Sequence, residues 1–171
     1  MHDDKSDFRP NNVQSIVLGT FMLWICWLFF NAGSTAQMAE LNDMEPDLIM
    51  MNTIIAGSAG GFFSVYLKHP LAGTWDGKQR YDVGALCNGI LIGLVSITAG
   101  CNNVEPWAAL IIGALASVVY GLAIRLMRKL KIDDPVEASA VHGFGGIWGL
   151  FVVGLFDRDE GVFYGGGQLG I

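Results

Sequence analysis

Charged residues are scarce in this sequence of 171 residues, since only 15% of them are Asp, Glu, Lys or Arg. A soluble domain of this length ordinarily carries about a quarter charged residues. Hydrophobic residues make up 52% of the chain, and the mean hydropathy is +0.44. A soluble body of this size is too small to cover that much apolar helix, so the composition excludes an ordinary soluble domain.

The sequence also lacks the patterns of several function classes. Its three cysteines, Cys26, Cys87 and Cys101, show no metal-ligand spacing, and we interpret them as small buried packing residues. The sequence has no Gly-rich phosphate loop, no paired carboxylates within a helix and no nucleophile elbow. We therefore expect no enzyme, no cofactor and no metal. Basic blocks with interleaved aromatic residues are absent too, which makes nucleic acid an unexpected partner.

The charges that are present leave five long uncharged intervals, of 30, 20, 22, 19 and 19 residues. A bilayer core roughly 30 Å thick needs about 20 residues of helix. We therefore predict an all-α polytopic membrane protein with five transmembrane helices. They are expected near residues 15–37, 48–67, 83–101, 106–125 and 136–156.

Basic residues lie on one side of this predicted topology. Nine of the ten precede the first helix or follow the second and the fourth: Lys5, Arg9, Lys68, Lys78, Arg80, Arg125, Arg128, Lys129 and Lys131. The other side has Arg158 alone. Because basic residues near helix ends stay cytoplasmic, the chain is expected to begin inside and to end outside the cell after five crossings. The expected location is the plasma membrane.

Glycine, in contrast, is abundant, with 23 residues. In an ordinary helix each glycine costs about 1 kcal/mol relative to alanine, but small residues four apart let helices in lipid approach closely. Every predicted helix after the first carries such a spacing: Gly57/Gly61, Gly89/Gly93, Gly113/Ser117/Gly121 and Gly145/Gly149. The pattern indicates a tight polytopic bundle.

The start of the fifth predicted helix has recognisable capping residues. Asp134 is placed to be the N-cap, Pro135 to occupy the first helical position, and Glu137 to be the acidic residue three after the cap. We predict these three residues as structural caps.

His142 is the most informative single residue. It lies about eight residues beyond Asp134, roughly 12 Å into the membrane. An ionisable group at that depth is expensive, and by default it indicates a substrate pathway or a proton relay. The alternative is a neutral histidine hydrogen-bonded to a neighbouring helix. Gly143, Gly145 and Gly146 beside it are expected to leave room for a ligand to approach the ring, whereas His69 lies in a predicted aqueous segment and receives no role.

The first predicted helix carries Trp27, Phe30 and Ser34 on one face, spaced i, i+3 and i+7. Aromatic faces attract cations, so this face could collect a small cation near the outer surface. The alternative is a plain packing stripe. Asn31, on the neighbouring face, needs a hydrogen-bond partner within the bundle, and we include it among the candidate pathway residues.

Several short strings occur in an order that is specific. They are GTFMLW (19–24), WLFFNAGS (27–34), CNG (87–89), ITAGC (97–101), VEPWAA (104–109), DDPVEA (133–138), HG (142–143) and GGGQLG (165–170). Together they resemble helices six to ten of the Amt/Mep/Rh ammonium transporter family, in its plant and protist type. The resemblance spans nearly the whole chain.

Members of this family have eleven helices, built as two inverted five-helix repeats plus one, and they form trimers with a pore in each subunit. Inverted repeats place the conduction path at their interface. The resemblance therefore implies that this chain is one half of the fold, without the family's first five helices and its last helix. The implied partners are ammonium or ammonia, the lipid bilayer, the N-terminal half-repeat and, in the complete protein, two further copies in a homotrimer.

The resemblance also assigns roles to residues. Ser34 would help to form an outer ammonium-recruiting site, Phe30 would be one of two stacked gate phenylalanines, and His142 would be the second of two pore histidines. The implied function is ammonium transport, in which ammonium is recruited and deprotonated and ammonia is conducted. A half-repeat exposes its pore surface, so we do not expect conduction by this chain alone. The alternatives are a non-transporting ammonium sensor or interaction subunit, and a defunct fragment.

Overall fold

The computed structural model describes residues 12–36, 46–75, 77 and 81–164, and within these ranges the chain is helical without strands. The elements are α1 (Val13–Ala36), α2 (Pro46–Ala72), α3 (Val83–Thr98), α4 (Pro106–Lys129), the π-helical segment η1 (Ser139–Phe144), α5 (Gly145–Phe156) and the short 3-10 helix η2 (Val162–Tyr164). The prediction of an all-α polytopic membrane fold is confirmed. The string GGGQLG (165–170) and four of the basic residues used for the topology, Lys5, Arg9, Lys78 and Arg80, lie outside the described residues.

Four of the described helical stretches are long and apolar enough to cross a membrane: Val13–Ser34, Pro46–Ala72, Pro106–Lys129 and Ser139–Phe156. Helix α3 is shorter. It has 16 residues, which gives about 24 Å of helix at 1.5 Å per residue. The predicted third span, 83–101, ends at Thr98 because the next residues form turns, in which Gly100 N–H bonds to Ile97 O at 3.1 Å and Asn103 N–H to Gly100 O at 3.0 Å.

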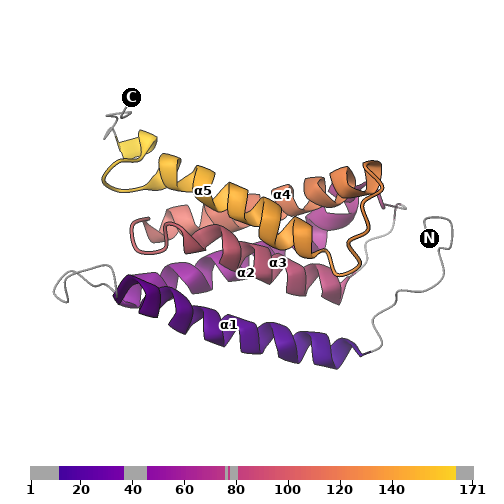
Figure 1. Ribbon diagram of the computed structural model, residues 1–171, viewed down its shortest axis with the longest axis horizontal. Coiled ribbons are helices and arrows are strands. Elements are labelled where there is room, and N and C mark those ends of the chain that lie inside the picture. The colour runs from indigo at the N-terminus through magenta and orange to yellow at the C-terminus, as the bar shows by residue number, and fades with distance from the viewer. Residues whose placement is uncertain (1–11, 37–45, 76, 78–80, 165–171) are drawn as a thin grey trace.

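Helices α1 to α5 run alternately in opposite directions, so the start of α1 and the end of α5 lie at opposite ends of the bundle (Figure 1). Helix α2 is central and packs most extensively against α4 and α3. Among the described elements, α1 packs against α3 and α2, and its buried residues are two polar ones, Thr20 and Asn31. Most of the apolar surface of α1 is therefore left uncovered by this chain.

The three central helices meet backbone to backbone around Ala56 of α2. A methyl group added at Gly93 of α3 or at Gly113 of α4 would overlap the Ala56 carbonyl oxygen, and one added at Gly60 of α2 would overlap the Gly89 carbonyl oxygen of α3. Close approach of this kind is what small residues four apart permit in lipid. The tight bundle predicted from the glycine spacing is confirmed for these helices.

The turn between α3 and α4 is tied to the bundle by a buried side chain. Asn52 of α2 is fully buried, and its Nδ2 donates to the carbonyl oxygens of Cys101 at 3.0 Å and Val104 at 2.8 Å. Asn103, in the same turn, donates to Asp157 Oδ2 at 2.7 Å just after α5. The turn between α3 and α4 is thereby joined to α2 and to the end of α5 at this end of the bundle.

The fifth helical stretch begins at Ser139, later than the predicted start at residue 136. Asp134 does bond to its first turn, since its carboxylate accepts from the N–H groups of Ala138 and Ser139, each at 2.9 Å. Pro135 and Glu137 lie before the helix, and their predicted capping positions are wrong. The reason is a turn closed by Glu137 N–H and Asp134 O at 3.1 Å, in which Glu137 adopts φ 58°.

The ends of two other helices differ from the sequence prediction. Helix α4 continues to Lys129 instead of ending near residue 125. Helix α2 continues to Ala72 instead of ending near residue 67, so Lys68 and His69 are helical residues. Cys87 and Cys101 are buried as expected, but Cys26 is exposed on α1.

Gly113→Ala is expected to destabilise the protein by about 1–3 kcal/mol, because overpacking against backbone atoms cannot be relieved by a change of side-chain rotamer. The matched control is Gly154→Ala in α5, where an added methyl meets nothing within 4 Å. This control should be neutral or slightly stabilising, because alanine favours helix by about 1 kcal/mol. Thermal unfolding of the purified protein in detergent measures both, and equal stability of the two variants would contradict the close contact at Ala56.

Candidate functional site

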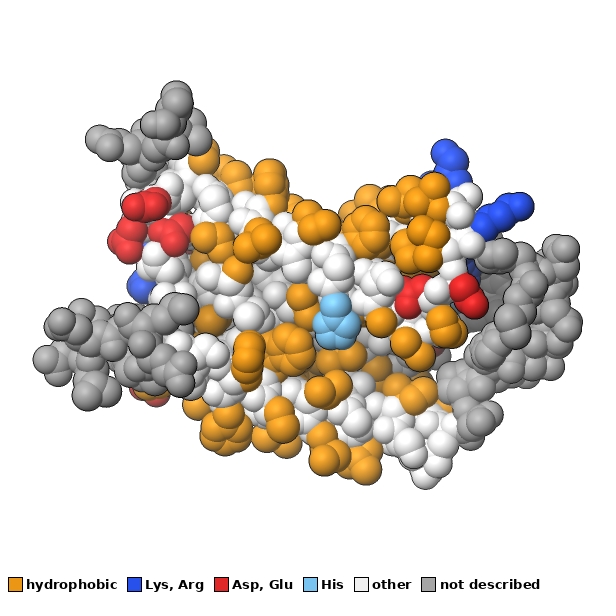
Figure 2. Space-filling model, in the orientation of Figure 1, with side chains coloured by type: hydrophobic (Ala, Val, Ile, Leu, Met, Phe, Trp, Pro, Cys, Tyr) orange, Lys and Arg blue, Asp and Glu red, His pale blue; other side chains and the backbone are white. Residues whose placement is uncertain are grey.

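An open pocket of about 370 Å³ lies between α1, α3 and α5. It is lined by Trp27, Val95, Thr98, Ala99, His142, Gly146 and Leu150. We refer to it as the His142 pocket. One view of the surface shows a histidine surrounded by hydrophobic side chains near the middle of the molecule (Figure 2). The lining is therefore mostly apolar, with an imidazole, an indole and a hydroxyl as its polar groups.

The His142 side chain is exposed in this chain and comes from the π-helical segment η1. Among the residues that the structure describes, none forms a hydrogen bond with its ring. Methyl groups added at Gly143 or Gly146 would meet no atom within 4 Å, so the space beside these two residues is open. The predicted open space is wrong at Gly145, because a methyl group there would lie 2.7 Å from Ile92 Cγ1 of α3. The ring nitrogens are consequently available to a molecule in the pocket.

Trp27 is held in a defined orientation at the opposite wall of the pocket. Its Nε1–H donates to Thr98 Oγ1 at 2.8 Å, and Thr98 Oγ1 donates to Leu94 O at 2.7 Å. The indole is thus fixed to the end of α3. Sequence reasoning did not identify Thr98, because the two residues are 71 positions apart and no local pattern pairs them.

Phe30 and Ser34 continue the same exposed face of α1 toward the end of that helix. The Phe30 ring lies edge-on to Trp27, with ring centroids 6.2 Å apart, and the Phe30 side chain is 58% exposed. Ser34 Oγ donates to Phe30 O at 2.7 Å. Because a hydroxyl also has lone pairs that accept hydrogen bonds, Ser34 can receive an N–H donor from a cation while keeping this bond.

Asn31 lies on a different face of α1. It is 2% exposed, and its Nδ2 donates to Thr53 Oγ1 of α2 at 3.0 Å. Thr53 in turn donates to Ile49 O at 2.7 Å. Asn31 therefore joins α1 to the bundle, and the structure does not bring it together with Trp27 and His142 at the pocket.

A second group of polar residues, which we call the polar cluster, was not foreseen from the sequence. It consists of Lys68, Asp82, Asn88, Tyr120 and Glu137. Lys68 Nζ, on a side chain only 12% exposed, lies 3.2 Å from Asp82 Oδ2 and 3.1 Å from Glu137 Oε2. The Tyr120 hydroxyl and, at 2.9 Å, Asn88 Nδ2 donate to the same Glu137 oxygen. The cluster links α2, α3 and α4 to the segment before η1.

Asp82 begins α3, and its Oδ1 accepts the Gly84 N–H at 2.8 Å. Burial alone would raise the pKa of Asp82, but the Lys68 ammonium and the backbone N–H groups of Ala85 and Gly84 together hold this pKa below its ordinary value. His69 Nε2 lies 3.4 Å from the Asp82 carboxylate. The sequence prediction missed this cluster because it placed Lys68 and His69 in an aqueous segment. In the structure both residues belong to α2.

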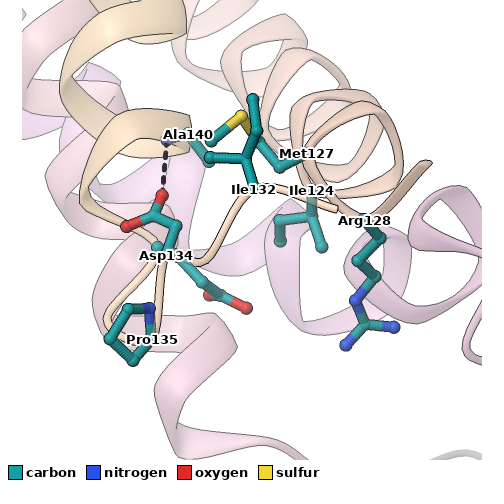
Figure 3. A pocket seen from close by; sticks show the side chains of 8 residues that line it. Ile124, Met127, Arg128, Ile132, Asp134, Pro135 and Ala140 are labelled. Atoms are coloured by element: carbon teal, nitrogen blue, oxygen red, sulfur yellow. Dashed lines mark hydrogen bonds between the residues drawn. The ribbon is translucent and has the colours of Figure 1, made fainter. Parts of the chain in front are cut away.

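A smaller pocket of about 220 Å³ adjoins the polar cluster. It is lined by Ile124, Met127, Arg128, Ile132, Asp134, Pro135, Glu137 and Ala140. The Asp134 carboxylate bonds there to the Ala140 N–H at 3.4 Å (Figure 3). The turn that contains Asp134, Pro135 and Glu137 thus lines this pocket together with Ala140 of η1.

Four helical stretches long enough to cross a membrane, together with an apolar pocket that contains a histidine, define a multi-pass α-helical membrane protein. A family model described as the Ammonium Transporter Family matches residues 1–170. The chain belongs to this family, and the resemblance noted in its sequence is confirmed.

Individual relatives agree with this assignment. The chain is 40% identical over 163 residues to "Ammonium transporter 1 member 3" of Solanum lycopersicum, an alignment covering 90% of this chain and 34% of that protein. Its fold matches the crystal structure of Saccharomyces cerevisiae Mep2 with a TM-score of 0.76 and 32% identity, over 92% of this chain and 32% of Mep2. A structure titled "Sensor Amt Protein" matches with a TM-score of 0.77 and 35% identity, over 92% of this chain and 37% of that protein. The chain thus spans about a third of the length of its relatives.

Proposed function

We propose that this chain forms one wall of an ammonium-conducting pore and acts as part of a complete transporter, which also contains the preceding half-repeat. The observation that carries this proposal is the His142 pocket, where Trp27 and His142 line one apolar hollow and Phe30 lies against Trp27. The names of the relatives support ammonium as the substrate.

Recruitment takes place at the Ser34 end of this face. Ammonium carries four N–H donors and a positive charge. The Ser34 hydroxyl offers lone pairs to one donor, and the rings of Phe30 and Trp27 attract the charge through their negative faces. The same groups would bind a potassium ion, so recruitment alone does not determine selectivity.

Selectivity arises deeper, at the apolar part of the pocket. Moving an ion into such surroundings costs far more than moving a neutral molecule. In our proposal ammonium gives its proton to a bulk water molecule at the mouth near Phe30, which forms hydronium there, and the neutral ammonia that remains passes His142, whose ring nitrogens offer a hydrogen bond. Potassium has no proton to lose and is excluded.

The direct test is His142→Ala in the complete transporter. The flux of ammonium should fall about two- to tenfold, the rate equivalent of one lost hydrogen bond worth about 0.5–1.5 kcal/mol, or potassium should be admitted. Leu150→Ala is the matched control, because Leu150 lines the same pocket without a polar group. Uptake by cells and the amount of inserted protein are measured together. Unchanged flux and selectivity at normal insertion would remove His142 from the mechanism.

The same assay separates the alternatives. The likeness to a structure titled "Sensor Amt Protein" favours a sensor as the second candidate function. A response to ammonium in signalling, without flux, would assign this chain to a sensor or an interaction subunit. Rapid turnover in the membrane, without flux or signalling, would identify a defunct fragment.

The proposal includes an orientation. The start of α1 lies in the cytoplasm and the end of α5 outside, because the basic residues gather at one side. The plasma membrane as the location and a trimer as the assembly are proposed from the family resemblance. A tag inserted after Asp43 should be accessible from outside intact cells, and a tag after Lys78 should not. The reverse labelling pattern would overturn the orientation, and a subunit count from native mass spectrometry tests the trimer.

A further inference from the structure

His142 lies within a π-helical segment, η1, which spans Ser139–Phe144. A π-helix is closed by i→i+5 hydrogen bonds, and such turns are rare and frequently occur at functional sites. Because one residue of α-helix corresponds to a rotation of about 100°, the extra residue of a π-turn changes the direction in which nearby side chains point. The direction of the His142 ring thus depends on how this segment begins.

Two residues before this segment lies Glu137, which has an unusual backbone conformation. Its φ of 58° lies in the left-handed region, which is uncommon for residues other than glycine. Such conformations persist where the surroundings hold them. The Glu137 carbonyl oxygen accepts the Val141 N–H at 3.0 Å, so this strained residue also starts the helical hydrogen bonds that lead to His142.

The side chain of Glu137 supplies the restraint. Its Oε2 receives Lys68 Nζ at 3.1 Å from α2, Asn88 Nδ2 at 2.9 Å from α3 and the Tyr120 hydroxyl from α4. Hydrogen bonds to an ionised carboxylate are about twice as strong as neutral ones. One carboxylate oxygen therefore fixes the turn against three helices of the central bundle.

The other contacts at this point do not select between a π-turn and an α-turn. Asp134 accepts the N–H groups of Ala138, Ser139 and Ala140, and such a cap stabilises a helix start of either kind. The Glu137 contacts differ, because they act on the residue with the left-handed backbone.

We propose that Glu137 is a positioning residue for His142. Its contacts with Lys68, Asn88 and Tyr120 hold the left-handed turn, maintain the π-helical start and direct the imidazole into the His142 pocket. The functional consequence rests on the proposed pore function, whereas the structural consequence does not. Without the carboxylate, residues 137–144 can relax into a regular α-helix, which turns the side chain at position 142 by about 100° away from the pocket.

Thiol labelling in the complete transporter tests this structural consequence without using transport. Cys26, Cys87 and Cys101 are replaced by alanine, and His142→Cys places a thiol at the pocket. The rate at which this thiol reacts with a small water-soluble methanethiosulfonate is measured in the His142→Cys protein. It is measured again in three proteins that carry a second substitution, which is Glu137→Ala, Glu137→Gln or Glu160→Gln. The last is a matched control, because Glu160 is exposed in the turn that follows α5.

The labelling rate should fall about tenfold with Glu137→Ala and less with Glu137→Gln, which keeps an acceptor oxygen but loses the charge that pairs with Lys68. Glu160→Gln should leave the rate unchanged. A reference thiol from Leu150→Cys, beyond η1, should react at an unchanged rate in every background. A general loosening of the protein would change that reference rate, whereas a local rotation does not.

Wild-type labelling rates in both Glu137 variants would overturn the proposal, and so would equal changes at positions 142 and 150. If Glu137→Ala does not fold, Glu137→Gln decides alone: slowing of roughly threefold supports the proposal, and an unchanged rate contradicts it. Failure of the proposed pore function would appear as unchanged ammonium flux in the His142→Ala transporter. The labelling result does not depend on that flux, so the two failures can be told apart.

Discussion

The close contact of three helices around Ala56 is the constraint on which the rest of this structure depends. Gly93 and Gly113 have no side chain, so α3 and α4 lie directly against the backbone of α2. This contact fixes the position of α3, and both α1 and α5 pack against α3. Within the described residues, α1 and α5 both pack against α3 but not against each other, and the His142 pocket lies between them.

The charged residues of the polar cluster lie apart from the His142 pocket, as one wall of a pore for a neutral molecule requires. Lys68, Asp82 and Glu137 gather at one end, where they bond to one another and to the helix starts. The middle of the open face keeps His142 and Trp27 among apolar side chains. An ion entering that region would lose its hydration without gaining a charged partner there, whereas a neutral molecule would lose little. The separation of charge from the pocket is therefore as important to our account as the histidine itself.

The sequence predicted what depends on composition and short spacing. The helical class followed from the uncharged intervals, and the contact at Gly93 and Gly113 followed from small residues four apart. It did not predict the polar cluster, because Lys68 and Glu137 are brought together only by tertiary packing. The left-handed backbone of Glu137 was hidden for a related reason, since the string around it is a good helix start by local rules. Capping preferences describe an isolated helix, and contacts from three other helices overrode them.

The measurement that tests this account most directly compares ammonium flux into proteoliposomes that contain either this chain alone or the complete transporter at equal density. The large apolar side chains exposed on α1 and α5, such as Phe30 and Leu150, are expected to be covered by the other half-repeat. The account predicts flux through the complete transporter and none above empty liposomes through the chain alone. Comparable flux through the chain alone would contradict it, because the pore would then need no second wall.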